Sequence, residues 1–350
     1  MCLVPGRSFS QDLVEGEYLS RQHTSMVNGV FIWLVFLRHF GQYQPSFAGV
    51  DEWILLHECD FLGQLIVSTF FFFSGWGIMS SLQKKGQLYV KNLICVRFPG
   101  LLRKFVLAVL VFLGIQAMLG EYYPWERVMW SLIGWLSVGN SNWFIFMTLL
   151  MYLLVAGSCA VVSVNRPLTG VLLVCVLLAV VVFVVGEIKY SYWYDTLYCL
   201  PAGMMYQLLH RYIKRNWLKW LGLAAVVLIP AGWWFYHHVW ELASVMPFHQ
   251  FWFRGMWGNV GSVLFATGVA LLAGSWSILF PSVSTAGRWL AWCGGPALFY
   301  IYIYQRIPML LGQRFGLASW SGNIYWCVCV CATLLIALGA VRFSGRGGTR

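Results

Sequence analysis

About ten stretches of roughly 20 predominantly apolar residues recur along this chain of 350 residues, and they limit its fold more than any other feature. A helix of about 20 residues is long enough to cross the hydrocarbon core of a bilayer. Hydrophobic residues make up 60% of the sequence and charged residues only 10%, against about 25% charged in ordinary soluble domains. The pattern predicts an all-α, polytopic membrane bundle.

We predict about ten transmembrane helices in one membrane domain, residues 25–342. The segments between the apolar stretches are too short for a further folded domain. Residues 1–24 are charged and lack the apolar centre of a signal peptide, so we expect a cytosolic lead-in. Residues 343–350 form a basic tail. The predicted spans are 25–42, 62–81, 101–120, 143–164, 168–188, 193–210, 217–236, 256–280, 290–312 and 323–342.

The charge distribution predicts how the chain sits in the membrane. When successive loops are assigned alternately to the two sides, 17 of the 23 lysines and arginines fall on the side of the N-terminus. Cytosolic loops carry such an excess, so both termini are predicted to be cytosolic. The net charge of +11 therefore reflects topology and does not indicate nucleic-acid binding. We expect a multi-pass protein of a bacterial plasma (inner) membrane.

Arg38 and His39 lie side by side inside the first apolar stretch. A guanidinium at the centre of a bilayer costs roughly 2.5–3.5 kcal/mol, so ionisable residues there usually face a cavity or a partner. His39 lies 14 residues after Ser25, about 21 Å along a helix, which is roughly two-thirds of the way across the hydrocarbon core. This depth makes His39 a candidate functional residue.

Asn28 precedes His39 by 11 residues, which places both within about 20° of the same helix face. Such a polar stripe can line a path from the cytosol to mid-membrane. A histidine exchanges a proton near neutral pH and can act as a general base toward a sugar hydroxyl. In the alternative interpretation, His39 only hydrogen-bonds a neighbouring helix and Arg38 extends outward to the interface.

Four motifs in order resemble the transmembrane acyltransferase-3 family. The first is the first-helix histidine, His39, followed by a second helix containing Phe-Phe-Phe-Phe-Ser-Gly-Trp at 70–76 and a basic segment that includes Arg97. The others are Ser-Asn-Trp-Phe-Ile at 141–145, Trp-Tyr-Asp-Thr-Leu at 193–197 leading to Pro-Ala-Gly-Met at 201–204, and Tyr-Ile-Tyr-Gln-Arg-Ile-Pro-Met at 302–309. The resemblance runs from about Ser25 to Pro308.

The resemblance implies a bundle of about ten helices that transfers an acyl group, usually acetyl from acetyl-coenzyme A, to hydroxyls of cell-envelope glycans or lipid-linked sugars. It also implies an essential role for His39. The chain departs from the family at three positions. Asn28 stands where the family has an arginine, Ser68 stands where many members have an acidic residue, and Gly100 replaces the second basic residue after Arg97.

Arg97 aligns with the family's basic position and is a candidate for binding the phosphates of coenzyme A, because clustered cations attract polyanions. The positive-inside bias alone accounts for its neighbours Lys84 and Lys85. Ser74, beside Gly75, is a candidate substrate contact. In the alternative, this small pair permits close helix packing.

The remaining candidate residues lie near predicted outer boundaries or within the ninth span. Asn142 and Trp143 can bind sugar hydroxyls, or they can be an N-cap and an interfacial aromatic residue. Asp195 is a candidate binding residue with helix capping as the alternative. Gln305 and Arg306 are intramembrane, and Arg306 can stabilise an oxyanion or bind an anionic group of the acceptor.

No metal site is expected. Most of the ten cysteines lie in apolar runs, where cysteine behaves as a small hydrophobic residue. His237, His238 and His249 lack supporting ligands at metal-binding spacing. We therefore expect no permanently bound cofactor, with acyl-coenzyme A as a donor substrate.

The sequence thus predicts an acyl-coenzyme A-dependent O-acetyltransferase with His39 and Arg306 as catalytic residues. Its partners are the lipid bilayer, the acyl donor and an envelope glycan or lipid-linked saccharide. A polytopic transporter or flippase is the alternative, although such proteins more often contain paired broken helices in an internal repeat. A third alternative is an inactive relative that acts as a scaffold, since the family arginine is replaced by Asn28.

Overall fold

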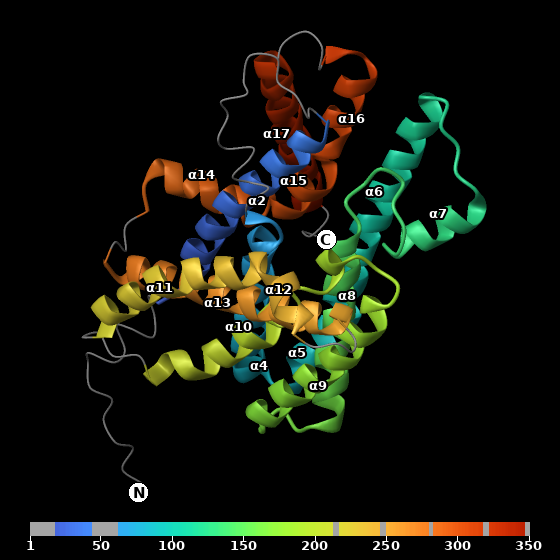
Figure 1. Ribbon diagram of the computed structural model, residues 1–350. Helices are drawn as coiled ribbons and strands as arrows, with labels where there is room; N and C mark the ends of the chain where they lie inside the picture. The colour runs from blue at the N-terminus through green and yellow to red at the C-terminus, as the bar shows by residue number, and fades with distance from the viewer. Residues whose placement is uncertain are drawn as a thin grey trace, which may run out of the picture.

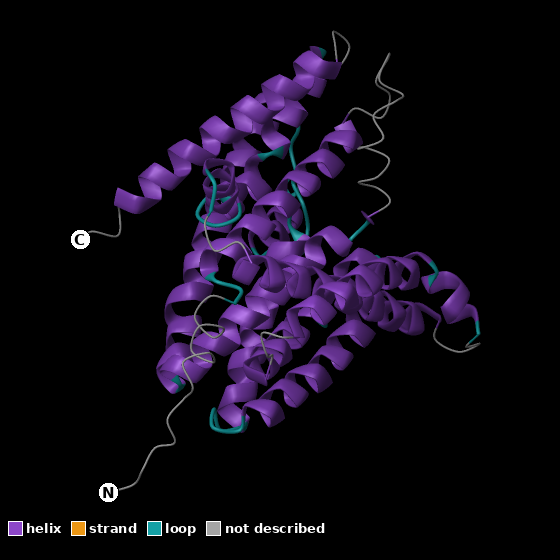
Figure 2. Cartoon of the chain, turned by 90° about the vertical axis from the view of Figure 1, so that its left-hand side faces the viewer, coloured by secondary structure: helices purple, strands orange, loops and turns teal. Residues whose placement is uncertain are grey.

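The computed structural model describes residues 18–43, 62–212, 217–245, 250–279, 283–317 and 322–346. All regular secondary structure in these ranges is helical, as Figures 1 and 2 show. The predicted all-α class is therefore confirmed. The lead-in up to residue 17, the 44–61 segment, His249 and the last four residues lie outside the described ranges.

Seven helical segments in the described part of the chain are long and apolar enough to cross a membrane, which confirms a multi-pass helical membrane protein at this coarse level. They match seven of the ten predicted spans. The number ten and the side of each terminus stay predictions. The seven segments are α4 (Leu65–Lys85), the run formed by α5 (Gln87–Asn92), the π-helix η1 (Leu93–Arg97) and α6 (Phe98–Met118), α8 (Trp143–Val161), α9 (Pro167–Gly186), α11 (Leu218–His237), α13 (Gln250–Leu279) and α17 (Gly322–Arg346).

The other three predicted spans differ in form. The first is α2 (Arg21–Tyr43), a single helix of 23 residues that is not among the seven apolar segments. The sixth contains a 3₁₀ turn, η2 (Ser191–Trp193), followed by α10 (Cys199–Leu209), which has only 11 residues. Pro201 lacks the N–H that would bond the carbonyl of Leu197, so a continuous helix cannot begin earlier without losing that bond.

The ninth predicted span, 290–312, is broken into three short helices. They are α14 (Thr285–Cys293), α15 (Leu298–Tyr304) and α16 (Arg306–Arg314). Gly294, Gly295 and Pro296 separate α14 from α15. Pro308 removes the donor that would bond the carbonyl of Tyr304, so the helix breaks at Gln305. The expectation of one continuous helix here is wrong, and the break places two polar residues at a helix junction.

The remaining described helices are short connectors: α7 (Trp125–Leu132), η3 (His210–Tyr212) and α12 (Val239–Ser244). Helix α17 continues through Arg346, so the first four residues of the predicted basic tail belong to this helix. In Figure 1, α6 and α7 lie on the opposite side of the bundle from α11 and α14.

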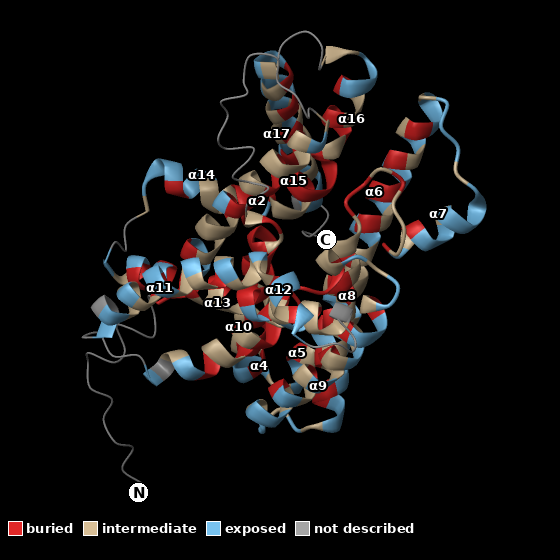
Figure 3. Ribbon diagram, in the orientation of Figure 1, coloured by how far each residue is buried: buried red, intermediate tan, exposed pale blue. Residues whose placement is uncertain are grey.

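Helix α4 is the central helix of the bundle. Of the most apolar stretch of α4, 72% of the residues are buried, against 11% for the corresponding stretch of α11. Figure 3 shows buried residues concentrated around α4. It crosses α10 closely because both helices place glycine at the contact. A Cβ at Gly75 would overlap the backbone carbonyl of Leu200, and one at Gly203 would overlap that of Phe72. The packing role predicted for Gly75 is therefore confirmed.

Helix α2 packs against α14 in the same way. A Cβ at Gly29 would overlap the carbonyl of Leu290, and one at Gly294 would overlap the backbone of α2 at Gly29. This contact fixes the middle of α2 against the broken segment. Its last two turns, including His39, are thereby directed toward the α15–α16 junction.

We expect Gly75→Ala to destabilise the protein by about 1–3 kcal/mol, because the added methyl group must separate two helix backbones. Gly77 lies two residues further along α4, on roughly the opposite helix face, with open space around its Cβ position, so Gly77→Ala is the matched control. The control is expected to be neutral or to stabilise by up to about 1 kcal/mol, since alanine favours helix. Thermal unfolding of both variants in detergent tests this pair, and equal melting temperatures would contradict the packing assignment.

Candidate functional site

Two polar cavities are described in this bundle, at opposite ends of the antiparallel helices α2 and α4. We call the first the histidine pocket. Its volume is about 450 Å³. Residues from α2, α4 and its preceding turn, the loop before α8, η2, α15 and α16 line it: Val35, Arg38, His39, Gln42, Gly63, Gln64, Ile66, Val67, Ser137, Asn140, Ser141, Asn142, Trp143, Tyr192, Tyr302 and Arg306.

Five of the predicted site residues meet in the histidine pocket although they come from three separate parts of the sequence. They are Arg38, His39, Asn142, Trp143 and Arg306. The break in the ninth span explains the last of these, because it lets the chain present Arg306 at the start of α16 beside the end of α2. The catalytic roles assigned to His39 and Arg306 stay predictions.

Gln305 binds directly to the imidazole. Its Nε2 lies 2.9 Å from Nδ1 of His39 and 3.0 Å from the backbone oxygen of Tyr302. The side chain is fully buried, and within the described residues its Oε1 has no hydrogen-bond partner. His39 therefore does bond a neighbouring helix, as the structural alternative expected, and it also lines a cavity.

The histidine pocket has an excess of positive charge. Nη2 of Arg306 donates to Oε1 of Gln42 at 3.0 Å, while its Nε is buried without a partner among the described residues. Nη1 of Arg38 is likewise buried without a hydrogen-bond partner among the described residues. No aspartate or glutamate is found among the described residues that line this cavity. Both arginines line the cavity, where a guanidinium group can interact with an anionic ligand or a developing oxyanion.

The loop before α8 is held by its own polar side chains. Nδ2 of Asn142 donates to the oxygen of Gly134 at 2.8 Å, and Oδ1 of Asn140 accepts from the amide of Val138 at 3.1 Å. Asn142 occupies the N-cap position of α8, as the alternative expected, but its side chain forms no cap hydrogen bond there. The amide of Asn142 shapes this wall of the pocket, and Trp143 adds a ring to it.

Asp195 lies behind the histidine pocket and does not line it. Its carboxylate accepts a hydrogen bond from the hydroxyl of Tyr236 at 3.2 Å, and that hydroxyl accepts from the amide of Gln64 at 3.2 Å. Oγ of Ser262 donates to the backbone oxygen of Asp195 at 2.9 Å. No described contact of Asp195 caps a helix, so the capping interpretation is wrong. Asp195 anchors the α4 end of the pocket through Tyr236.

Asn28 lines neither cavity. Its Oδ1 is buried without a hydrogen-bond partner within the described ranges, beside the close contact of Gly29 with α14. The predicted continuous polar path from Asn28 to His39 is therefore wrong. Asn28 and His39 belong to one continuous helix, α2, as the periodicity assumed. Helix α14, however, packs against α2 near Asn28.

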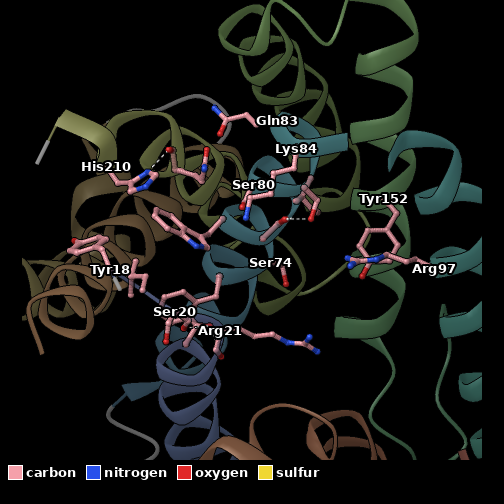
Figure 4. Close-up of a pocket in the computed structure, with 18 residues that line it drawn as sticks. Tyr18, Ser20, Arg21, Ser74, Ser80, Gln83, Lys84, Arg97, Tyr152 and His210 are labelled. Carbon is pink, nitrogen blue, oxygen red and sulfur yellow. Dashed lines mark hydrogen bonds between the residues drawn. The ribbon is translucent and has the colours of Figure 1, made fainter. Parts of the chain in front are cut away.

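The second cavity, which we call the basic pocket, lies where α2 begins and α4 ends. Its volume is about 830 Å³, and three cationic side chains line it: Arg21, Lys84 and Arg97. Figure 4 shows these residues around the cavity, with Ser74 and Tyr152 on its wall. The two predicted residues Ser74 and Arg97 thus share a cavity.

Arg97 is positioned by the π-helix η1, which ends at this residue. Such local widening of a helix is rare and is often found at functional sites. Nη1 of Arg97 donates to the hydroxyl of Tyr89 at 2.9 Å, and its guanidinium carbon lies 5.1 Å from the centre of that ring. The side chain is itself exposed, so a ligand can reach its remaining donors.

A cluster of rings, Phe70, Phe71, Phe144 and Tyr302, lies beside the part of α4 between the two cavities, and we call it the aromatic layer. The ring of Phe144 lies 4.7 Å from that of Phe71, 5.9 Å from Phe70 and 5.4 Å from Tyr302, between ring centres. On α4, Val67 lines the histidine pocket and the residue six positions later, Phe73, lines the basic pocket. Six residues of helix span roughly 9 Å, so the parts of α4 that line the two cavities are less than two helical turns apart.

Several lining residues were not predicted. Gln42 follows Arg38 by four residues and so shares its helix face, a spacing that could have identified it. Tyr302 and Arg306 both line the pocket although the helix breaks between them, so spacing alone did not identify Tyr302. Tyr192 and His210 carried no local signal, because only tertiary packing brings them to a pocket.

We expect Phe144→Ala to connect the two cavities, because the lost ring contacts every other member of the aromatic layer. Chloride release from proteoliposomes measures the connection, since both cavities carry cationic residues. Phe105→Ala removes a fully buried ring outside the layer and is the control. Release should rise only in Phe144→Ala. An intact barrier in a correctly folded Phe144→Ala variant would show that other groups close the path.

Comparison with known proteins leaves the family open. No family model, no curated protein and no solved structure matches this chain. The resemblance to the acyltransferase-3 family therefore rests on the four sequence motifs alone, and its functional implications are proposals.

Proposed function

We propose that this protein is a membrane O-acyltransferase. It transfers an acetyl or similar small acyl group from acyl-coenzyme A to a hydroxyl of a cell-envelope polysaccharide or lipid-linked sugar. The observation that carries the proposal is the pairing of two polar cavities, one lined by cations and one by an imidazole, less than two helical turns apart on α4 beside the aromatic layer. A donor and an acceptor that approach from opposite membrane faces require such a pair.

The basic pocket suits the donor. Coenzyme A carries several phosphate charges, and a cavity lined by Arg21, Lys84 and Arg97 attracts a polyanion. The charge bias of the sequence predicts that this end of the bundle faces the cytosol, where acyl-coenzyme A is available. Ser74 and Tyr152 on the same wall offer hydroxyl groups to the pantetheine arm.

The histidine pocket suits the acceptor. In the proposed reaction, the hydroxyl oxygen of the acceptor attacks the thioester carbonyl while its proton passes to His39. Arg306 stabilises the oxyanion, the carbon–sulfur bond breaks, and the thiolate takes the proton from the imidazole. The products are the ester and free coenzyme A, and no oxidant or other reactant is needed. Arg38 is placed to hold an anionic group of the acceptor.

The two substrates meet only if the acyl group passes the aromatic layer. The separation of roughly 9 Å along α4 is short compared with an extended pantetheine arm. We therefore propose that the arm enters between Phe71 and Phe144 and delivers the thioester to His39. The phosphates stay in the basic pocket.

Transport of a glycan or small molecule is the second candidate. Two cavities at opposite ends of a bundle, with the aromatic layer beside the part of α4 between them, also suit alternating access. The broken α14–α16 segment and the short α10 are discontinuous helices of the kind found at transporter binding sites. This candidate predicts movement of a substrate without a chemical change.

Labelled acetyl-coenzyme A and envelope extract, incubated with the protein in proteoliposomes, distinguish the two candidates. We expect label to reach glycan with the wild-type protein. His39→Gln should lower the rate by roughly 10²–10⁴-fold, because the general base is lost. Arg97→Gln should raise the KM for the donor and leave kcat nearly unchanged, since Arg97 is proposed to bind phosphate and not the reacting atoms.

Lys91→Gln is the matched control, because Lys91 is an exposed cation of the same segment that does not line the basic pocket. It should change neither constant. Equal transfer by wild type and His39→Gln would remove His39 from the mechanism. No transfer by any form, together with uptake of unmodified glycan, would favour transport, and the absence of both would favour a scaffold.

A further inference from the structure

The hydrogen bonds around Gln305 define the state of the imidazole. The amide nitrogen of Gln305 lies between two atoms, Nδ1 of His39 at 2.9 Å and the backbone oxygen of Tyr302 at 3.0 Å. The glutamine side chain is fully buried, so water does not compete for these positions. Each of the two amide hydrogens therefore has one protein acceptor.

The direction of these bonds follows from the chemistry of the groups. A backbone oxygen only accepts hydrogen bonds, and an amide NH₂ group only donates them. If the amide were reversed, its oxygen would face the oxygen of Tyr302 at hydrogen-bonding distance, and two acceptors would repel each other. The nitrogen is thus the group that faces Nδ1, and Nδ1 must be the acceptor.

A neutral imidazole carries its single proton on the nitrogen that does not accept. We propose that Gln305 is a positioning residue that holds neutral His39 with its proton on Nε2. Since Gln305 covers Nδ1 and His39 lines the histidine pocket, Nε2 is the ring nitrogen that meets a ligand. The resting imidazole therefore presents a hydrogen-bond donor to the cavity.

This state cannot accept a proton at Nε2, which has a consequence that rests on the proposed function. His39 becomes a base toward the acceptor hydroxyl only when the side chain of Gln305 moves away from the oxygen of Tyr302 and its Oε1 accepts from a proton on Nδ1. Once Gln305 has uncovered Nδ1, water in the histidine pocket takes the proton from Nε2 and gives one to Nδ1, so the net charge does not change. Oε1, which has no partner among the described residues, gains one in that state, while the bond to Tyr302 is lost.

Nitrogen-15 NMR of histidine-labelled protein in nanodiscs tests the proposal at alkaline pH, where the ring is neutral. Protonated and unprotonated ring nitrogens have well-separated chemical shifts, and the spectrum of His39→Gln assigns the signals of His39. In the wild type we expect a protonated Nε2 and an unprotonated, hydrogen-bonded Nδ1.

Gln305→Glu should reverse the assignment. An ionised glutamate at this position offers only oxygen acceptors to Nδ1. A protonated glutamate donates its own proton to the oxygen of Tyr302 and also presents an acceptor to Nδ1. In both cases Nδ1 must carry the proton. Gln305→Met is the matched control, because it keeps the length of the side chain and removes the amide. It should remove the hydrogen bond to Nδ1, so that the neutral ring becomes a mixture of the two tautomers and the Nδ1 signal moves away from its wild-type position.

A proton on Nδ1 in the wild type would overturn the proposal, as would a Gln305→Glu spectrum identical to that of the wild type. Should Gln305→Glu fail to fold, the wild type and Gln305→Met still decide the outcome through the Nδ1 signal. These spectra need no substrate. A failed acyl-transfer assay therefore contradicts the proposed function without affecting the tautomer, and a reversed tautomer contradicts the role of Gln305 alone.

Discussion

The constraint on which this structure depends is the need of ionisable side chains within a membrane bundle for polar surroundings. Helix α2 carries Arg38 and His39 in its last turns. The broken helix α15–α16 packs beside these residues. The junction of α15 and α16 supplies Gln305 to the imidazole and places Arg306 in the same cavity. Pro308 favours that junction, because it lacks the N–H that would bond the carbonyl of Tyr304 in a continuous helix. A continuous helix would also present different side chains to α2.

The sequence was sufficient where a single helix decides the outcome. Seven of the ten spans predicted from apolar length match long apolar helices, and the first span, which carries Arg38 and His39, is the single helix α2. Sequence reasoning failed where a second element intervenes. Asn28 shares the face of His39 but is covered by α14, and Asn142 and Asp195 use their polar groups to hold a loop and a tyrosine. Such partners are distant in the sequence and carry no periodic signal.

Most of the predicted site residues line one of the two cavities. Arg97 and Ser74 lie in the basic pocket, while His39, Arg38 and Arg306 lie in the histidine pocket. Helix α4 lines both, and its phenylalanines pack with Phe144 beside the part of the helix between them. The aromatic motif that resembles the acyltransferase-3 family therefore belongs to the helix that runs from the imidazole to the cationic cavity.

The central claim is that one ligand bridges these cavities. A cryo-electron microscopy map of the protein in nanodiscs with a saturating, non-hydrolysable thioether analogue of acetyl-coenzyme A tests it most directly. The account predicts density for the phosphates beside Arg97 and Lys84, with the arm passing Phe144 and ending near His39. An empty basic pocket, or an analogue bound only on the outer surface of the bundle, would contradict it.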